Sequence, residues 1–153
     1  DQGPLAREPC TKMKISIDDI KLHEDAIHRG PAQVYPAVRD SISESMKKVG
    51  ITILEPVQTH VIEVPNDFMS AVTRLVLTKR GQLLDVKQDE SGAEITAKLP
   101  VGEMLGWSSD LRSATEGRGV SSLLDQNFEP MPREIQALVV RKIRDRKGLA
   151  ENQ

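Results

Sequence analysis

The order of strand and helix patterns between residues 57 and 130 constrains the fold of this chain more than any other feature. Segments with period-two alternation of apolar residues predict strands, and segments with three- and four-residue spacing predict helices. Along the chain they run as strand 60–64, helix 66–78, strand 82–88, strand 93–99, helix 101–111 and strand 120–125. This βαββαβ order is the signature of a ferredoxin-like split βαβ sheet with both helices on one face. We therefore predict an α+β domain over residues 57–153.

The two helices of this domain have defined apolar sides. In the first, Phe68, Val72, Leu75 and Val76 share one side, and the cations and glycine at 79–81 favour its end. Asn66 or Asp67 is the expected N-cap. The second is expected to place Met104 and Leu105 inward. A final helix opens at Pro132, and its apolar stripe contains Ile135, Leu138, Val139 and Ile143.

Residues 1–56 read as a separate domain of strand, exposed loop and helix. Apolar residues alternate at 13–17 and again, one residue out of phase, at 20–22, which predicts a strand with a bulge. The helix pattern ends at Val49, with Pro36 expected in its first turn and Gly50 as C-cap. One strand and one helix bury little surface. Because the chain starts at Asp1 without Met, we expect a fragment whose missing strands lie upstream.

Composition excludes several classes of protein. The formal net charge is −2, from 21 basic and 23 acidic residues, so any RNA contact must depend on local patches. Cys10 is the single cysteine, which favours a reducing compartment such as the cytoplasm. No apolar run approaches the roughly 18 residues of a membrane span. The phosphate-binding loop pattern of P-loop GTPases is missing as well, so no such GTP site is expected here.

The most informative segment is the exposed run 23–31, His-Glu-Asp-Ala-Ile-His-Arg-Gly-Pro. A solvated turn without a function is the simplest interpretation of these residues alone. A zinc hydrolase using His23 and His28 is the enzymatic alternative. A zincin helix needs histidines four residues apart, whereas these two are five apart and are followed by Gly30 and Pro31. We therefore expect no metal site.

The same run resembles the tip loop of domain IV in the translation elongation factor 2 family. Three other segments resemble its domain V and the passage into it, namely 54–56, 65–69 with 79–81, and 110–119. Bacterial elongation factor G lacks the histidine motif, and the proline after Gly30 resembles archaeal members. The resemblance thus covers almost the whole chain. It implies the second half of domain IV followed by a complete ferredoxin-like domain V and a C-terminal helix.

The resemblance implies that His28 is the residue converted to diphthamide. His23 is then expected to orient or pack the loop, and Asp25 to brace it or to be recognised by the diphthamide-synthesis enzymes. Arg29, with His28 and the helix after Gly30, is expected to favour phosphate anions. Lys79, Arg80, Arg112 and Arg118 are the candidate rRNA contacts; ordinary surface charge and helix capping are the alternatives. The basic final helix is more simply a solvated face.

The family role is ribosomal translocation of tRNA and mRNA, with the tip loop entering the decoding site. By this resemblance the chain is not itself an enzyme, and GTP and Mg²⁺ belong to a missing N-terminal portion. The expected partners are the ribosome and the diphthamide-synthesis enzymes. A free-standing ferredoxin-like RNA-binding protein and another ribosome-associated GTPase relative remain as alternatives.

Overall fold

The computed structural model describes residues 2–149 and divides the chain into two compact units. The first unit combines Asp1–Ile53 with Pro132–Gln153, and the second is Leu54–Met131. The ends of the expected domains, at residue 1 and at 150–153, lie outside the described residues. Among the described residues, no helix has both the length and the apolar character needed to cross a membrane.

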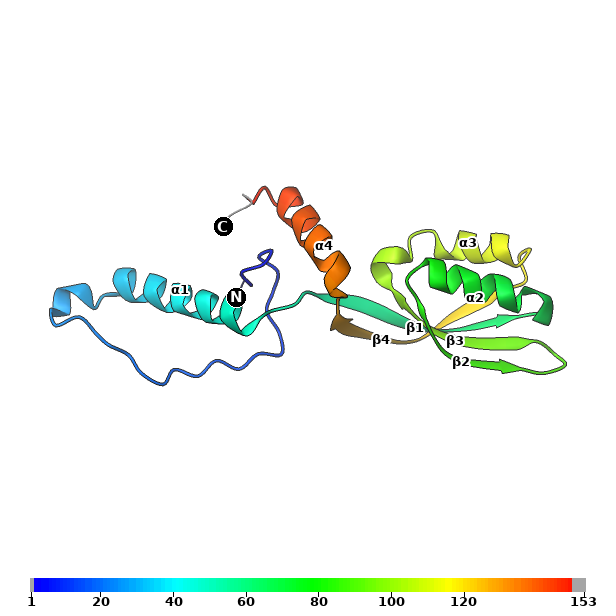
Figure 1. Cartoon of the computed structure of the whole chain (residues 1–153), viewed down its shortest axis with the longest axis horizontal. Coiled ribbons are helices and arrows are strands. Elements are labelled where there is room, and N and C mark those ends of the chain that lie inside the picture. Colours follow the sequence, from blue (N-terminus) through cyan, green and yellow to red (C-terminus); the bar gives the residue numbers. More distant parts are fainter. Residues whose placement is uncertain (1, 150–153) are drawn as a thin grey trace. The chain divides into compact units, whose positions relative to one another are not determined.

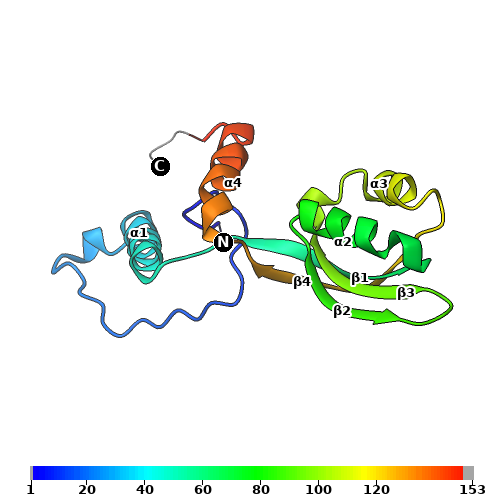
Figure 2. The same cartoon turned by 45° about the vertical axis from the view of Figure 1, so that its right-hand side comes forward.

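The second unit is a four-stranded antiparallel sheet covered on one face by two helices (Figure 1). Its spatial strand order is β2-β3-β1-β4, which is that of the ferredoxin-like split βαβ fold. Figure 2 shows both helices on the same side of the sheet. The elements are β1 (Leu54–Val64), α2 (Met69–Thr78), β2 (Gln82–Gln88), β3 (Ala93–Pro100), α3 (Trp107–Ala114) and β4 (Val120–Pro130). The predicted fold class is confirmed.

The core of this unit lies between the sheet and the two helices. Every second residue of β3 is buried, as period-two alternation requires of a strand with one covered face. Val72 and Val76 of α2 are fully buried opposite the strands, and Phe68 and Leu75 pack against the same cluster. Gly81 lies so close to this core that an added Cβ would come within 2.6 Å of a Val76 methyl group. Glycine is therefore required where α2 turns into β2.

The second helix differs from its prediction. Residues 101–103 form a short 3-10 turn, and α3 begins only at Trp107, after Gly106 in the left-handed conformation (φ +79°). This break turns Leu105 outward, where it is 90% exposed, so its predicted inward position is wrong. Trp107, which is 6% exposed, fills the core, and Met104 packs against it as predicted.

Pro56 lies inside β1, although the sequence suggested a boundary there. At this point β1 pairs with Phe128 of β4, whereas its pairing with β3 starts one residue later, at Val57. On the side of β3, β1 is therefore unpaired at Pro56, and proline is tolerated at such an edge position because no hydrogen bond between strands needs its N–H. Helix α2 also lacks the expected side-chain cap. The Asn66 amide donates through Nδ2 to the Asp89 carbonyl at 2.8 Å, and its Oδ1, the atom that would cap the helix, accepts no hydrogen bond.

The first unit contains η1 (Ala26–His28), α1 (Pro31–Val49) and α4 (Arg133–Arg146). Helix α1 begins five residues before Pro36, so that proline is inside the helix and not in its first turn. Pro31 occupies the first helical position, where its missing N–H costs nothing. Gly50 ends the helix as predicted, with φ +86° and its N–H donated to the Met46 carbonyl.

The strand predicted at 13–22 is not formed. This segment pairs with no strand among the described residues, and its alternating apolar side chains are 43–62% exposed. An isolated extended segment leaves its N–H and C=O groups to water, so period-two alternation alone does not create a strand.

Helix α4 groups with the first unit, whereas the sequence placed it in the second domain. Lys147 Nζ donates to the carbonyls of Ala6 and Arg7, both at 3.0 Å, and pairs with the Glu8 carboxylate at 2.8 Å. Arg144 donates to the Leu5 carbonyl at 2.9 Å. Two cations of the basic helix therefore anchor the turn near the start of the chain.

Candidate functional site

The histidine tip loop is an exposed turn immediately before α1. Residues 26–28 form one 3-10 turn, closed by hydrogen bonds from His28 N–H to Asp25 O and from Arg29 N–H to Ala26 O, both 3.1 Å. Gly30 then adopts an extended conformation, and its carbonyl accepts the N–H groups of Gln33 and Val34 in the first turn of α1, both at 3.0 Å. All side chains from His23 to Arg29 are exposed.

The Arg29 side chain bonds the loop's own backbone. Its Nε donates to the His23 carbonyl at 2.6 Å, and its Nη2 donates to the Glu24 carbonyl at 2.7 Å. A planar guanidinium can satisfy two neighbouring acceptors at once because its donors form a fixed fork. Arg29 was expected to be a phosphate donor, and in this structure two of its donors face the protein.

The two histidines of the loop are in contact. Their ring centroids are 4.7 Å apart in an edge-to-face arrangement. His23 Nδ1 accepts the backbone N–H of Asp25 at 3.1 Å, which fixes the orientation of the His23 ring. The loop thus brings His23, Asp25 and His28 together, and the orienting role of His23 stays a prediction.

These three residues offer ligand atoms that lie within 4.8 Å of one another, close enough to hold a metal ion. The spacing argument against a helical zinc motif does not apply to a 3-10 turn. Whether the loop can bind a metal ion depends more directly on the hydrogen bond that His23 already makes. Because His23 Nδ1 accepts a hydrogen bond from the Asp25 N–H, the ring proton lies on Nε2. A metal bound to His23 would have to break the bond from Asp25.

Lys79 and Arg80, two of the candidate rRNA contacts, form ion pairs inside the second unit. Arg80 lies between Glu55 and Glu103, at 2.9 Å from an oxygen of each carboxylate. The hydrogen bond to Glu55 is the main cause that raises the pKa of Arg80. Lys79 Nζ lies 2.7 Å from the Asp110 carboxylate. Lys79 is therefore more than a free surface charge, because its ammonium group is paired with Asp110.

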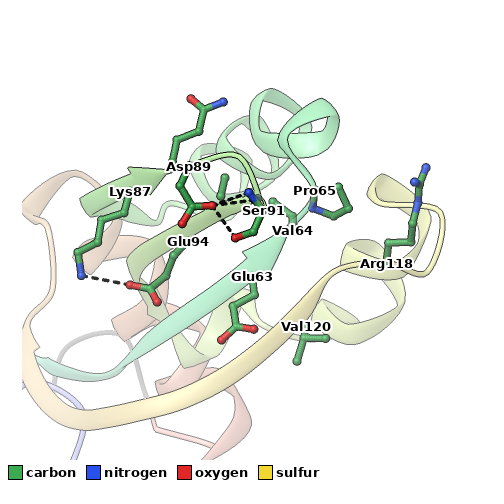
Figure 3. Close-up of a pocket in the computed structure, with 12 residues that line it drawn as sticks. Glu63, Val64, Pro65, Lys87, Asp89, Ser91, Glu94, Arg118 and Val120 are labelled. Carbon is green, nitrogen blue, oxygen red and sulfur yellow. Dashed lines mark hydrogen bonds and ion pairs between the residues drawn. The ribbon is translucent and has the colours of Figure 1, made fainter.

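Arg112 and Arg118 are exposed. Arg118 stacks over the Phe68 ring at 4.5 Å from its centroid and pairs with Glu116 at 3.2 Å. Arg118 also borders a shallow hollow of about 470 Å³ at one end of the sheet (Figure 3). The polar groups of this hollow bind one another: Lys87 points to Glu94, and the Asp89 carboxylate accepts from Ser91.

His60 is the third histidine and has a structural position in β1. It is 7% exposed, and its ring nitrogens lie 2.9 Å from the Ser121 hydroxyl and 3.0 Å from the Gln58 amide oxygen. Trp107 Nε1 donates to the same Ser121 hydroxyl at 3.1 Å. Burial lowers the pKa of His60. This network explains how a polar residue is accommodated beside the core.

The sequence pointed to the cations Lys79 and Arg80, but it did not identify the carboxylates that pair with them. Glu55, Glu103 and Asp110 lie far along the chain from the residues they pair with, so no local pattern identifies them. The role of Arg29 had one local signal, its position directly before a glycine and a helix start. Only the turn geometry shows which carbonyls it reaches.

Two family models match consecutive parts of this chain. The model of domain IV of elongation factor G matches residues 1–50, and the model of the elongation factor G C-terminus matches residues 52–139. Their junction, at residue 51, lies close to the boundary between the two compact units at residues 53 and 54.

Curated relatives called elongation factor 2 match nearly the whole chain. The protein of Nanoarchaeum equitans is 52% identical over 149 residues, and that of Methanosphaera stadtmanae is 47% identical over 149 residues. The protein of Pyrococcus furiosus is 43% identical over 152 residues. These matches cover 97–99% of this chain and 20–21% of the relatives, so the chain spans about a fifth of their length.

Proposed function

The chain belongs to the elongation factor G and elongation factor 2 family, and from this premise we propose that it acts in ribosomal translocation of tRNA and mRNA as part of a longer protein. In this proposal His28 is the residue converted to diphthamide, and the tip loop enters the decoding region. The observation that carries the proposal is the braced, exposed turn that holds His28 directly before α1.

The electrostatics of the loop support a contact with RNA. Helix α1 is 19 residues long, its N-terminus follows the loop, and its first turn contains no acidic residue. Pro31 has no N–H, and the N–H groups of Gln33 and Val34 donate to Gly30 O, so the attraction for anions comes mainly from the positive end of the helix dipole. A quaternary ammonium added to His28 would place a fixed cation near this helix end, where backbone phosphates or codon–anticodon groups could be contacted.

The second unit is proposed to contact rRNA through its exposed cations. Arg112 and Arg118 are the best placed of the four candidates, since Lys79 and Arg80 are held by internal carboxylates. Such contacts orient a protein on RNA and need not read sequence. In this proposal Lys79 and Arg80 stabilise the second unit through their ion pairs, and Arg112 and Arg118 contact the RNA.

The parent protein is proposed to be a cytoplasmic GTPase that is modified by the diphthamide-synthesis enzymes. No segment of this chain has the spacing of a phosphate-binding loop, so no GTP site of that kind is expected in it. We assign GTP and Mg²⁺ to another part of the parent.

A translocation assay with the full-length parent tests this proposal. Ribosomes and parent protein from the same organism are compared for the wild type, His28→Asn and the control Arg39→Lys, which changes an exposed cation of α1. We expect slower translocation or more frequent frameshifting for His28→Asn alone. Equal behaviour of all three proteins in both measurements would contradict a role of His28 at the decoding site.

A further inference from the structure

Arg29 is the residue that ties the two ends of the tip loop together. It follows His28 in sequence, yet its side chain reaches back to the carbonyls of His23 and Glu24 at 2.6 and 2.7 Å. Among the described residues Arg29 takes part in no ion pair, so these two bonds are its polar side-chain contacts. A charged donor strengthens each bond relative to a neutral pair.

These bonds act on His28 through His23. Fixing the His23 carbonyl fixes the backbone that carries the His23 ring, and the Asp25 N–H holds that ring at Nδ1. The His23 ring in turn packs edge-to-face on His28, with 4.7 Å between centroids. Without the guanidinium, the hydrogen bonds left within residues 23–29 would be the two backbone bonds of the 3-10 turn and the bond from Asp25 N–H to His23.

We propose that Arg29 is a positioning residue that presents the His28 imidazole in one orientation to the enzymes that modify it. This inference rests on the proposed modification of His28. The guanidinium bonds the two carbonyls through two nitrogens, Nε and Nη2, that are held in one rigid plane, whereas lysine would have to reach both from a single nitrogen on a flexible stem. Arg29 therefore serves the loop, and a direct contact of its two bonded donors with RNA would require the loop to open.

The test compares Arg29→Lys, Arg29→Gln and the control Arg39→Lys with the wild type. Each full-length parent is expressed in cells that naturally carry it, and the modified fraction of the His28 peptide is measured by mass at an early time after induction. The loop itself is followed in the 153-residue chain by the nuclear Overhauser contact between the His23 and His28 ring protons. The buried His60 ring provides an internal reference.

For both Arg29 variants we expect the modified fraction to fall about tenfold, the factor that the loss of one to two hydrogen bonds produces. The contact between the two rings should disappear, while the melting temperature stays unchanged because the loop is exposed. Arg39→Lys should behave as the wild type in all three measurements.

The possible failures separate the two proposals. An unmodified wild-type His28 would overturn the proposed function, whereas the ring contact would still test the bracing by Arg29. Equal modification of the wild type and Arg29→Lys would overturn the positioning role alone. Loss of modification with an intact ring contact would also overturn it, because Arg29 would then be read directly by the modifying enzymes.

Discussion

Replacing Arg80 with alanine should destabilise the second unit strongly, although arginine is a typical surface residue. Arg80 donates to both oxygens of the Glu55 carboxylate, at 3.3 and 2.9 Å, and to Glu103 at 2.9 Å. The Glu55 side chain is 10% exposed, so water cannot replace the lost donors. Leaving a charged acceptor buried and unpaired costs about 3 kcal/mol. For a unit of this size that lowers the melting temperature by more than about 10 °C.

Thermal unfolding of the chain, followed by the fluorescence of Trp107 in the core of the unit, measures this loss. The matched control is Arg112→Ala, which removes an exposed guanidinium from α3 and should change stability by less than about 0.5 kcal/mol. Glu55→Ala in the Arg80→Ala background should restore part of the loss, because the unpaired buried charge is then removed as well.

A loss for Arg80→Ala as small as that for Arg112→Ala would refute this reasoning. It would mean that the carboxylate of Glu55 finds solvent or another donor, and Arg80 would then be available for RNA. Failure of Glu55→Ala to recover any stability would show that packing of the arginine stem, and not the charge, was lost.

Three further results are expected. Burial lowers the pKa of His60 below its ordinary 6.5, so the unfolded chain binds a proton more readily and the free energy of unfolding should fall as the pH decreases from about 7 to 5. In urea titrations at several pH values, His60→Gln should flatten this slope. Gly81→Ala should cost about 1–3 kcal/mol because its Cβ would lie 2.6 Å from a Val76 methyl group, whereas Gly102→Ala, with no neighbour within 4 Å, should cost less than about 0.5 kcal/mol in the same titrations. Elemental analysis of dialysed protein should find far less than one zinc ion per chain, and stoichiometric zinc would contradict our prediction that the tip loop binds no metal.

The ferredoxin-like unit was predictable because its signals are local and agree with one another. The strand at 93–99 has period-two alternation and is joined to the strand at 82–88 by a polar turn, and α2 has a clear apolar side. The prediction failed where the same local pattern is compatible with two different structures. Val101 and Leu105 fit a helix, yet Gly106 in the left-handed conformation delays α3 until Trp107.

The first unit was less predictable, because its structure depends on contacts between distant residues. The alternation at 13–22 predicts a strand, but a strand forms only where another strand pairs with it. The grouping of α4 with the first unit depends on bonds from Arg144 and Lys147 to carbonyls about 140 residues earlier. In the tip loop, the residues were identified from the sequence, whereas the bracing by Arg29 required the geometry of the turn.

The decisive measurement is the mass of the peptide that contains His28, taken from the parent protein purified out of its native cells. We expect a gain that equals the diphthamide group, located on His28 by fragmentation, with His23 unmodified. An unmodified His28 would contradict the assignment of the tip loop to diphthamide-dependent translocation, even though the chain would remain a member of the elongation factor family.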